Sequence, residues 1–326
     1  MIVPMPPTTT PSAHIPVLLE AVLKGLNPHQ QSRGKYVDGT VGAGGHAAAL
    51  LTQAVDAVLL AIDRDPRSLA VAQETLAPFG DRVHFAQGSY ELLPHFAAEI
   101  GFEPGQIDGI LLDLGIASMH VDDPQRGFSF RTEAPLDMRF DPSSGLPTAA
   151  DLLNTLDAES LAHILFSYGE ERESRRIAKA VIAARPLRTT TQLANLIASV
   201  VHSTDHLHPA TRTFQALRIA VNDELGAVER TLPLALKTLK PGGRLAVISF
   251  HSLEDRIIKT YFHTEARDCL CPPKQIICTC GHRASIREIT RKPIVPDETE
   301  IRANPRSRSA KLRIAEKLIR SEGSHE

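Results

Sequence analysis

Three carboxylates end short apolar stretches in the first third of the sequence. Asp38 follows a Lys-Tyr-Val segment, Asp63 a Val-Leu-Leu-Ala-Ile segment and Asp113 an Ile-Leu-Leu segment. Such runs are typical of buried strands in a parallel sheet, where ligands bind at the carboxyl ends of the strands. Carboxylates gathered there would attract a cationic ligand and repel a phosphate. Asp113 has a second interpretation, because Asp commonly caps a helix N-terminus.

A glycine-rich turn follows the first carboxylate. Its glycines have no Cβ, so the backbone can turn sharply and a ligand can lie against it; they are Gly39, Gly42, Gly44 and Gly45. The residues from His46 onward have high helix propensity, so the turn should open a helix whose free N–H groups face the same spot. Asp63 follows Gly45 by eighteen residues, a distance at which an acid can bond ribose hydroxyls. The pattern indicates a nucleotide site, although a structural strand-to-helix turn also uses glycine.

The position of Asp38 separates two classes of nucleotide. A dinucleotide site prefers Gly-x-Gly-x-x-Gly, which places a pyrophosphate on a helix N-terminus, whereas here an acid precedes the first glycine. S-adenosylmethionine carries an ammonium, a sulfonium and a ribose but no phosphate. The sequence therefore favours S-adenosylmethionine over NAD, and calorimetric titration of each would separate a methyltransferase from an oxidoreductase.

Strand and helix patterns alternate in the first part of the chain, which predicts an α/β fold with a doubly wound parallel sheet. The expected strands are residues 35–38, 57–63, 83–87, 107–113 and 244–250, with 286–294 and 310–315 as an antiparallel pair. The expected helices are residues 17–26, 46–53, 66–79 and 90–100, a long helix to 239 that Lys240-Pro-Gly-Gly stops, and one that ends at 262. Residues 114–146 are loop-like, and 148–202 have helical periodicity without strands, which predicts an inserted helical domain.

Several residues outside the strand ends suit RNA. Phe128 and Phe130 lie between two arginines, Arg126 and Arg131. The rings would stack a base while the arginines hold phosphates, or both rings would pack in a core. Tyr90, by contrast, begins a helix at a strand end, where an adenine ring could lie against it or where it would be an ordinary half-buried tyrosine. A basic stripe comprises Arg172, Arg175, Arg176 and Lys179 and is interleaved with glutamates. It is either an RNA-binding surface or simply a solvent-exposed helix face.

The composition limits the class of protein. The chain has 326 residues, 42% of them hydrophobic, and a formal net charge of -2, so it can bury a full core but has no global basic coat for nucleic acid. No apolar run reaches membrane-spanning length. Residues 1–13, expected to be a disordered tail, lack the features of a signal peptide. We expect a cytoplasmic protein without membrane contact.

All four cysteines lie within twelve residues, as Cys269-x-Cys271 and Cys278-x-Cys280. In a cytosolic protein this clustering favours a metal over disulfides. Zinc sites more often use Cys-x₂₋₄-Cys, and two Cys-x-Cys pairs chelate with more strain. The sequence leaves open a structural zinc ion or free thiols, and no catalytic metal is expected.

Ten stretches in one order closely resemble the RsmH (MraW) family of bacterial 16S rRNA methyltransferases. They are residues 14–22, 37–46, 61–66, 108–115, 126–131, 135–139, 168–172, 208–218, 248–256 and 304–313. The resemblance implies a class I S-adenosylmethionine methyltransferase, with a Rossmann-like doubly wound sheet and an inserted all-helical domain. We expect the methyltransferase domain in residues 14–120 and 208–326, and a substrate loop with a helical RNA-recognition domain in residues 121–207.

The resemblance also implies which residues hold the cofactor. Carried over one by one, they are Gly44, Gly45, His46, Asp63, Tyr90, Asp113 and His120. The family usually has Leu-Gly-Val-Ser-Ser after the aspartate and Gln at the last contact, whereas this chain has Gly115-Ile-Ala-Ser118 and His120. An imidazole can still donate to an adenine or ribose acceptor.

The implied activity is methylation of N4 of one cytidine, position 1402, in the P-site region of 16S rRNA within the small ribosomal subunit. This amine is a poor nucleophile, so catalysis needs in-line placement and an acceptor for its N–H bonds, for which Asp113 is the candidate. Residues expected to contact the RNA are Phe128, Phe130, Arg139 and His251 for the base, and Arg212 and Arg218 for phosphates. The alternative is an RNA-binding ribosome assembly factor that holds the cofactor without turnover.

Overall fold

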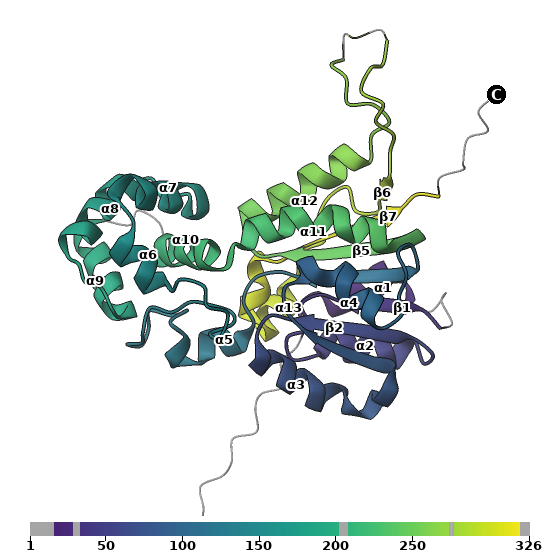
Figure 1. The fold of residues 1–326 in the computed structure, drawn as a ribbon, viewed down its shortest axis with the longest axis horizontal. Helices are drawn as coiled ribbons and strands as arrows, with labels where there is room; N and C mark the ends of the chain where they lie inside the picture. The colour runs from purple at the N-terminus through teal and green to yellow at the C-terminus, as the bar shows by residue number, and fades with distance from the viewer. Residues whose placement is uncertain (1–15, 29–32, 202–207, 274, 276, 320–326) are drawn as a thin grey trace, which may run out of the picture.

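The computed structural model of the chain, which describes residues 16–28, 33–201, 208–273, 275 and 277–319, shows a sheet covered by helices beside a separate helical body (Figure 1). The tail expected at residues 1–13 lies outside the described residues. The strands are β1 (Lys35–Asp38), β2 (Val58–Asp63), β3 (Val83–Gln87), β4 (Ile107–Asp113), β5 (Leu239–Ser249), β6 (Ile286–Glu288) and β7 (Lys311–Lys317).

The sheet has seven strands in the order β3-β2-β1-β4-β5-β7-β6. The strands from β3 to β5 are parallel, and β7 runs antiparallel to both β5 and β6. The strand order reverses between β1 and β4, and an open α/β sheet binds its ligands outside the carboxyl ends of the strands at such a point. The predicted doubly wound fold is confirmed.

Helices cover both faces of the sheet. One face carries α1 (Leu19–Leu26), α2 (Gly45–Gln53) and α3 (Pro66–Leu76), and the other carries α4 (Leu93–Glu99), α11 (Glu224–Thr238) and α12 (Ser252–Glu265). Successive strand residues point to opposite faces: in β2, Leu59 and Ala61 pack with the first group of helices, and Leu60 and Ile62 with the second. This two-sided burial explains why the strand sequences are apolar throughout.

The helical body stands beside the sheet and has its own core. Its helices are α6 (Ala149–Thr155), α7 (Ala158–Gly169), α8 (Ser174–Ala183), α9 (Thr190–Val200) and α10 (Thr211–Asn222). At Gly169 the backbones of α7 and α10 approach so closely that a Cβ would lie 2.6 Å from the carbonyl oxygen of Arg212. Phe214 and Leu217 of α10 are buried in the same cluster as Leu165 of α7. We therefore propose that the helical body continues past residue 207 to the end of α10.

Several predicted elements differ in the structure. The expected long helix is two helices, because Asp223 has a φ of +49°, which ends α10 before α11 begins. The last sheet strand before α12 begins at Leu239 rather than residue 244, since Leu239 already pairs with Ile107 of β4 and the register shifts between Ile107 and Gly109. The helix expected at 90–100 is η3 (Tyr90–Leu92) followed by α4.

The remaining described elements are short. They are η2 (Ala77–Arg82), α5 (Ser118–Asp122), η4 (Pro124–Arg126), α13 (Glu298–Ala303) and η5 (Pro305–Ser309). The first strand of the pair expected at 286–294 and 310–315 is limited to β6, and Ile294 forms an isolated bridge with Leu312. Within the described ranges, every helix is too short or too polar to cross a lipid bilayer.

Candidate functional site

The glycine turn after β1 is hydrogen-bonded to the end of β2. Gly44, the N-cap of α2, has a φ of +86°, a left-handed conformation that favours glycine. A Cβ on Gly45 would lie 2.5 Å from Cγ of Pro16, so that position has no room for a side chain. The Asp63 carboxylate accepts the N–H of Gly42 at 2.8 Å and a second N–H, two residues beyond itself, at 2.9 Å. The predicted glycines and the predicted ribose-binding acid therefore form one unit.

Asp38, Asp63 and Asp113, at the ends of β1, β2 and β4, form the strand-end edge. Burial raises the pKa of Asp38 to about 7, and the nearby Asp63 carboxylate adds to this effect. Burial also raises the pKa of Asp63, although backbone N–H groups partly offset it. Burial, Asp38 and Glu254 raise the pKa of Asp113 well above its usual range. A cation bound at this edge would offset the burial and favour the ionised carboxylates.

Asp113 is the least satisfied of the three. Its backbone N–H donates to Oγ1 of Thr40 at 2.6 Å, and its Oδ2 lies 3.7 Å from Nε2 of His46, the second residue of α2. Its Oδ1 is buried and has no hydrogen-bond partner among the described residues. A buried carboxylate oxygen without a donor is costly, so this atom favours a ligand that brings an N–H group or a positive charge.

Tyr90 starts η3 beside the strand-end edge. Burial raises the pKa of its hydroxyl, and the guanidinium of Arg64 lies 5.5 Å from the centre of its ring. Arg64 is itself fixed by hydrogen bonds to Ser89 Oγ at 2.6 Å and to the carbonyl of Asn222 at 2.7 Å. The predicted set Gly44, Gly45, His46, Asp63, Tyr90 and Asp113 thus lies on neighbouring loops at one edge of the sheet.

His120 has a different environment from the one expected of a cofactor contact. Its Nδ1 accepts the N–H of Ala117 at 3.1 Å, and its Nε2 donates to Oδ2 of Asp65 at 2.7 Å. The same Asp65 oxygen accepts from Nη1 of Arg126 at 2.9 Å. We call Asp65, His120 and Arg126 the brace. Because both imidazole nitrogens are engaged within it, a cofactor contact by His120 would have to break one of these bonds.

The brace holds a loop that the sequence analysis did not connect to β2. Arg126 also donates to the carbonyls of Arg139 and Phe140, at 3.0 and 2.8 Å. Burial alone would raise the pKa of Asp65, but hydrogen bonds from His120, a backbone N–H and Arg126 lower it to about 2. The partners come from positions 55 and 61 residues away in sequence, so no local pattern could have revealed them.

The aromatic residues expected to stack a base take part in packing. Phe128 lies 5.2 Å from the His120 ring and 5.8 Å from Phe140, measured between ring centres. Phe130 stacks on His208 at 4.6 Å and meets Phe214 edge-on at 5.0 Å. Both are only partly buried, so each contributes to the core of the helical body and keeps an exposed part.

Two of the arginines expected to bind RNA are already paired. Arg139 binds both carboxylate oxygens of Asp137, at 2.8 and 2.7 Å, and Arg218 binds both oxygens of Glu224, at 2.8 and 2.9 Å. Arg212 lies on α10 and is partly exposed. The basic stripe remains accessible, since all four of its side chains are exposed on and before α8.

His251 follows the end of β5 and leads to a buried acid, Glu254. It is the N-cap of α12, and its Nε2 lies 3.2 Å from Oε1 of Glu254. Burial would raise the pKa of Glu254, but His251 and Arg218 lower it, so it stays a carboxylate close enough to act on Asp113. The His-x-x-Glu spacing, typical of a capping box, is the sequence signal for this pair.

Among the residues that the structure describes, two groups of side chains have metal-ligand chemistry. The first is Glu224, His251 and Glu254, whose ligand atoms lie within 4.8 Å of one another; because Arg218 already neutralises Glu224, we assign no ion there. The second comprises the four cysteines and is taken up below.

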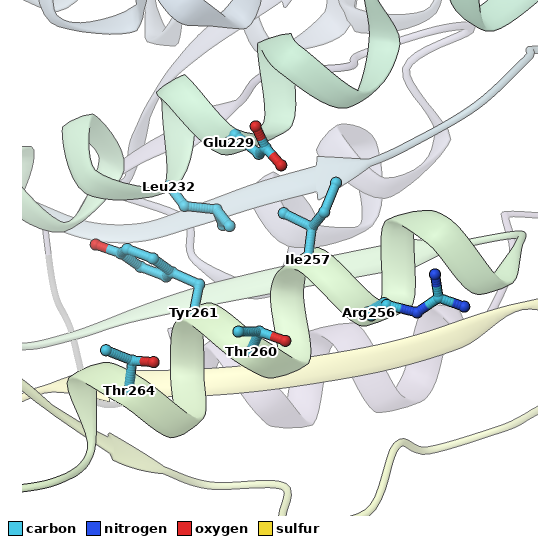
Figure 2. A pocket seen from close by; sticks show the side chains of 7 residues that line it. All are labelled: Glu229, Leu232, Arg256, Ile257, Thr260, Tyr261 and Thr264. Carbon is cyan, nitrogen blue, oxygen red and sulfur yellow. The ribbon is translucent and has the colours of Figure 1, made fainter. Parts of the chain in front are cut away.

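A groove on the outer surface of α11 and α12 is separate from these residues. Figure 2 shows its lining, which includes Glu229 and Leu232 from α11 and Arg256 and Tyr261 from α12. Its volume is about 420 Å³. It contains none of the predicted site residues, so the candidate site is defined by the chemistry of the strand-end edge.

Comparisons with known proteins show the family to which the chain belongs. The family model of the MraW methylase family matches residues 11–318. Ribosomal RNA small subunit methyltransferase H of Heliobacterium modesticaldum is 51% identical over 312 residues, which cover 94% of this chain and 98% of the relative. The proteins of that name from Dehalococcoides mccartyi, strain 195, and Thermomicrobium roseum are each 49% identical, and the alignments cover 94% of this chain and 87% and 94% of those relatives.

Proposed function

Because the chain belongs to the MraW methylase family, we propose that it transfers a methyl group from S-adenosylmethionine to N4 of a cytidine in the P-site region of 16S rRNA. The similar proteins are named as methyltransferases of small subunit ribosomal RNA. The observation that carries the proposal is the strand-end edge, where three partly or fully buried carboxylates have raised pKa values and Asp113 Oδ1 has no donor among the described residues.

The strand-end edge fits S-adenosylmethionine better than NAD. When bound, this cofactor supplies an electrophilic methyl group on a sulfonium. Asp38 and Asp113 would face its positive charges, and Asp63 would accept from ribose hydroxyls while still holding the glycine turn, because a carboxylate can accept more than the two N–H groups seen here. A pyrophosphate would bring negative charge to the same carboxylates.

Asp113 is the proposed catalytic residue. A cation beside it would offset the burial that raises its pKa and favour the ionised carboxylate. The ionised Oδ1 can then accept a hydrogen bond from the cytosine amine as positive charge develops on N4, which stabilises the transition state more than the ground state. The methylated amine is strongly acidic, so its proton can leave to water without a dedicated base.

The helical body is the proposed RNA-recognition part. Its basic stripe is exposed, and Glu170 at the end of α7 joins it to α12 by accepting from Ser252 at 3.0 Å and from Arg256 at 3.1 Å. These contacts place the body beside the carboxyl end of β5. The cytosine must leave its stack to reach the strand-end edge, and the exposed parts of Phe128 and Phe130 are the proposed stacking surface.

The decisive experiment is transfer of tritium-labelled methyl groups to RNA. The chain is incubated with isolated small ribosomal subunits or with protein-free 16S rRNA, and the product nucleosides are identified by mass spectrometry. We expect N4-methylcytidine in P-site RNA, with the assembled subunit as the better substrate. Binding of S-adenosylmethionine without any transfer to either substrate would instead identify an RNA-binding assembly factor.

A further inference from the structure

The segment between α12 and β6 forms an arm that projects from the domain. In Figure 1 it is the light green excursion that leaves the end of α12 and returns to β6, well away from the helical body. None of the described residues in 268–281 is buried, and Ile277 is 75% exposed. No strand or helix is assigned among these described residues. The described part of the arm therefore has neither an apolar core nor a β-ladder to hold its shape.

Its four thiols nevertheless converge. The Sγ atom of Cys269 lies 3.4 Å from that of Cys278 and 3.8 Å from that of Cys280, and the last two are 3.6 Å apart. All four Sγ atoms, including that of Cys271, lie within 4.8 Å of one another. A tetrahedron with Zn–S bonds of about 2.3 Å has S–S edges of about 3.8 Å, whereas a disulfide requires about 2.0 Å. The separations among Cys269, Cys278 and Cys280, from 3.4 to 3.8 Å, are close to the edges of this tetrahedron.

Backbone N–H groups support negative charge on these sulfurs. The N–H of Leu270 points to Sγ of Cys280 at 3.3 Å, and that of Cys271 to Sγ of Cys269 at 3.4 Å. The N–H of Thr279 points to Sγ of Cys271, also at 3.4 Å. Hydrogen bonds to a charged sulfur favour the thiolate, which is the form that binds a metal. The two Cys-x-Cys segments thus face each other as two halves of one site.

We propose that Cys269, Cys271, Cys278 and Cys280 bind one Zn²⁺ as a closed four-thiolate site that holds the arm in shape. Four thiolates in a tetrahedron suit zinc. Because the protein fills all four positions, no place remains for water or substrate, and the role is structural. The inference is independent of methyl transfer, since the arm shares no residue with the strand-end edge.

The first test is the metal content of the full chain, purified under reducing, anaerobic conditions with zinc present. We expect one zinc per chain by mass spectrometry. Cys271→Ser and Cys278→Ser, one from each half, should each reduce this to about a tenth or less, because a three-thiolate site binds zinc far more weakly. Thr279→Ala, which alters the same arm without removing a sulfur, is the matched control and should keep its zinc.

The second test uses cobalt in place of zinc. Co²⁺ added to the metal-free chain should give the visible bands of a tetrahedral ion and strong thiolate charge-transfer absorption, and zinc should displace it. Chelation should raise the rate of proteolytic cleavage within residues 268–281. The far-UV circular dichroism of the chain should stay nearly unchanged, because no helix or strand is assigned among the described residues of the arm. Four reactive thiols in a chain that takes up no zinc, two disulfides, or bound iron with sulfide would each overturn the proposal.

Discussion

Asp65, which follows β2, and Asp113, which ends β4, have opposite surroundings. Asp65 is fully buried, but its oxygens accept from the Arg67 N–H, His120 and Arg126, and its pKa falls to about 2. Asp113 has one oxygen with no donor among the described residues, and its pKa rises. The first arrangement fixes a loop in place. The second leaves a carboxylate oxygen that a cation or an N–H group could satisfy. This difference distinguishes a candidate binding site from a structural ion pair.

The largest effect should follow from breaking the brace. Arg126→Met leaves Asp65 buried with one charged partner fewer and should lower the free energy of unfolding by about 3–5 kcal/mol. Arg67→Met is the matched control, because that side chain is 64% exposed and pairs with Asp123 on the surface; it should cost less than about 1 kcal/mol. Urea denaturation measures both, and equal losses would remove the distinction between the brace and a surface pair.

The next effect concerns chemistry at the strand-end edge. Asp113→Asn keeps the shape and loses the charge, so single-turnover methylation at saturating cofactor should slow by about ten- to a thousandfold. Asp255→Asn is the control, because Asp255 is paired with Arg313 and Lys311, and it should leave turnover unchanged. If Asp113→Asn weakens cofactor binding while saturated turnover stays normal, Asp113 is a cofactor ligand without a catalytic role.

A smaller effect should appear in cofactor affinity alone. Asp63→Asn retains an oxygen for the glycine turn but loses the charged acceptor for the ribose, so binding of S-adenosylmethionine should weaken by about 1–3 kcal/mol. Calorimetry on the folded variant measures it. An unchanged dissociation constant would assign Asp63 to support of the turn rather than to the cofactor.

The pH dependence of binding should reflect Asp38. Its pKa is raised to about 7, so the carboxylate that attracts a cation forms only as pH rises through that value, and affinity should increase by up to about tenfold from pH 6 to pH 7. Without ligand the sign reverses: the folded state holds the proton between about pH 4 and 7, so stability falls as pH rises through this window. Asp38→Asn should give a shallower binding profile; an identical profile would refute the assignment.

The smallest effect should be on RNA. Reversing the charge of Arg175 and Arg176 should raise the apparent KM for the small subunit several-fold at low salt, with little difference at high salt, because surface contacts to phosphates are screened. Reversal of Lys237 and Lys259, exposed on α11 and α12, is the charge-matched control and should change KM little. A matching loss of cofactor affinity in the first variant would contradict an RNA role.

The strand-end residues could be predicted because their signals are local. An apolar run that ends in an acid identifies a strand end, and clustered glycines identify a turn, so Gly44, Asp63 and Asp113 were found without a structure. The pairings of Arg218 with Glu224 and of Arg126 with Asp65 were not predicted. In the sequence, an arginine that forms such an ion pair cannot be distinguished from one that binds an RNA phosphate. The effect of Glu254 on the pKa of Asp113 could not be predicted for a related reason, since it depends on the burial of both groups in the folded chain.

Period and composition by themselves determined the alternation of strands and helices, the parallel sheet and the edge at which a ligand would bind. Only the tertiary structure decided which charges are satisfied, that α10 packs with the helical body, and that four thiols meet in an arm without a core. The physical reason is the distance along the sequence over which each effect acts. Propensity and periodicity act between residues a few positions apart, whereas burial and ion pairing depend on which distant segments the folded chain brings together, as Asp65 and Arg126 show across 61 residues.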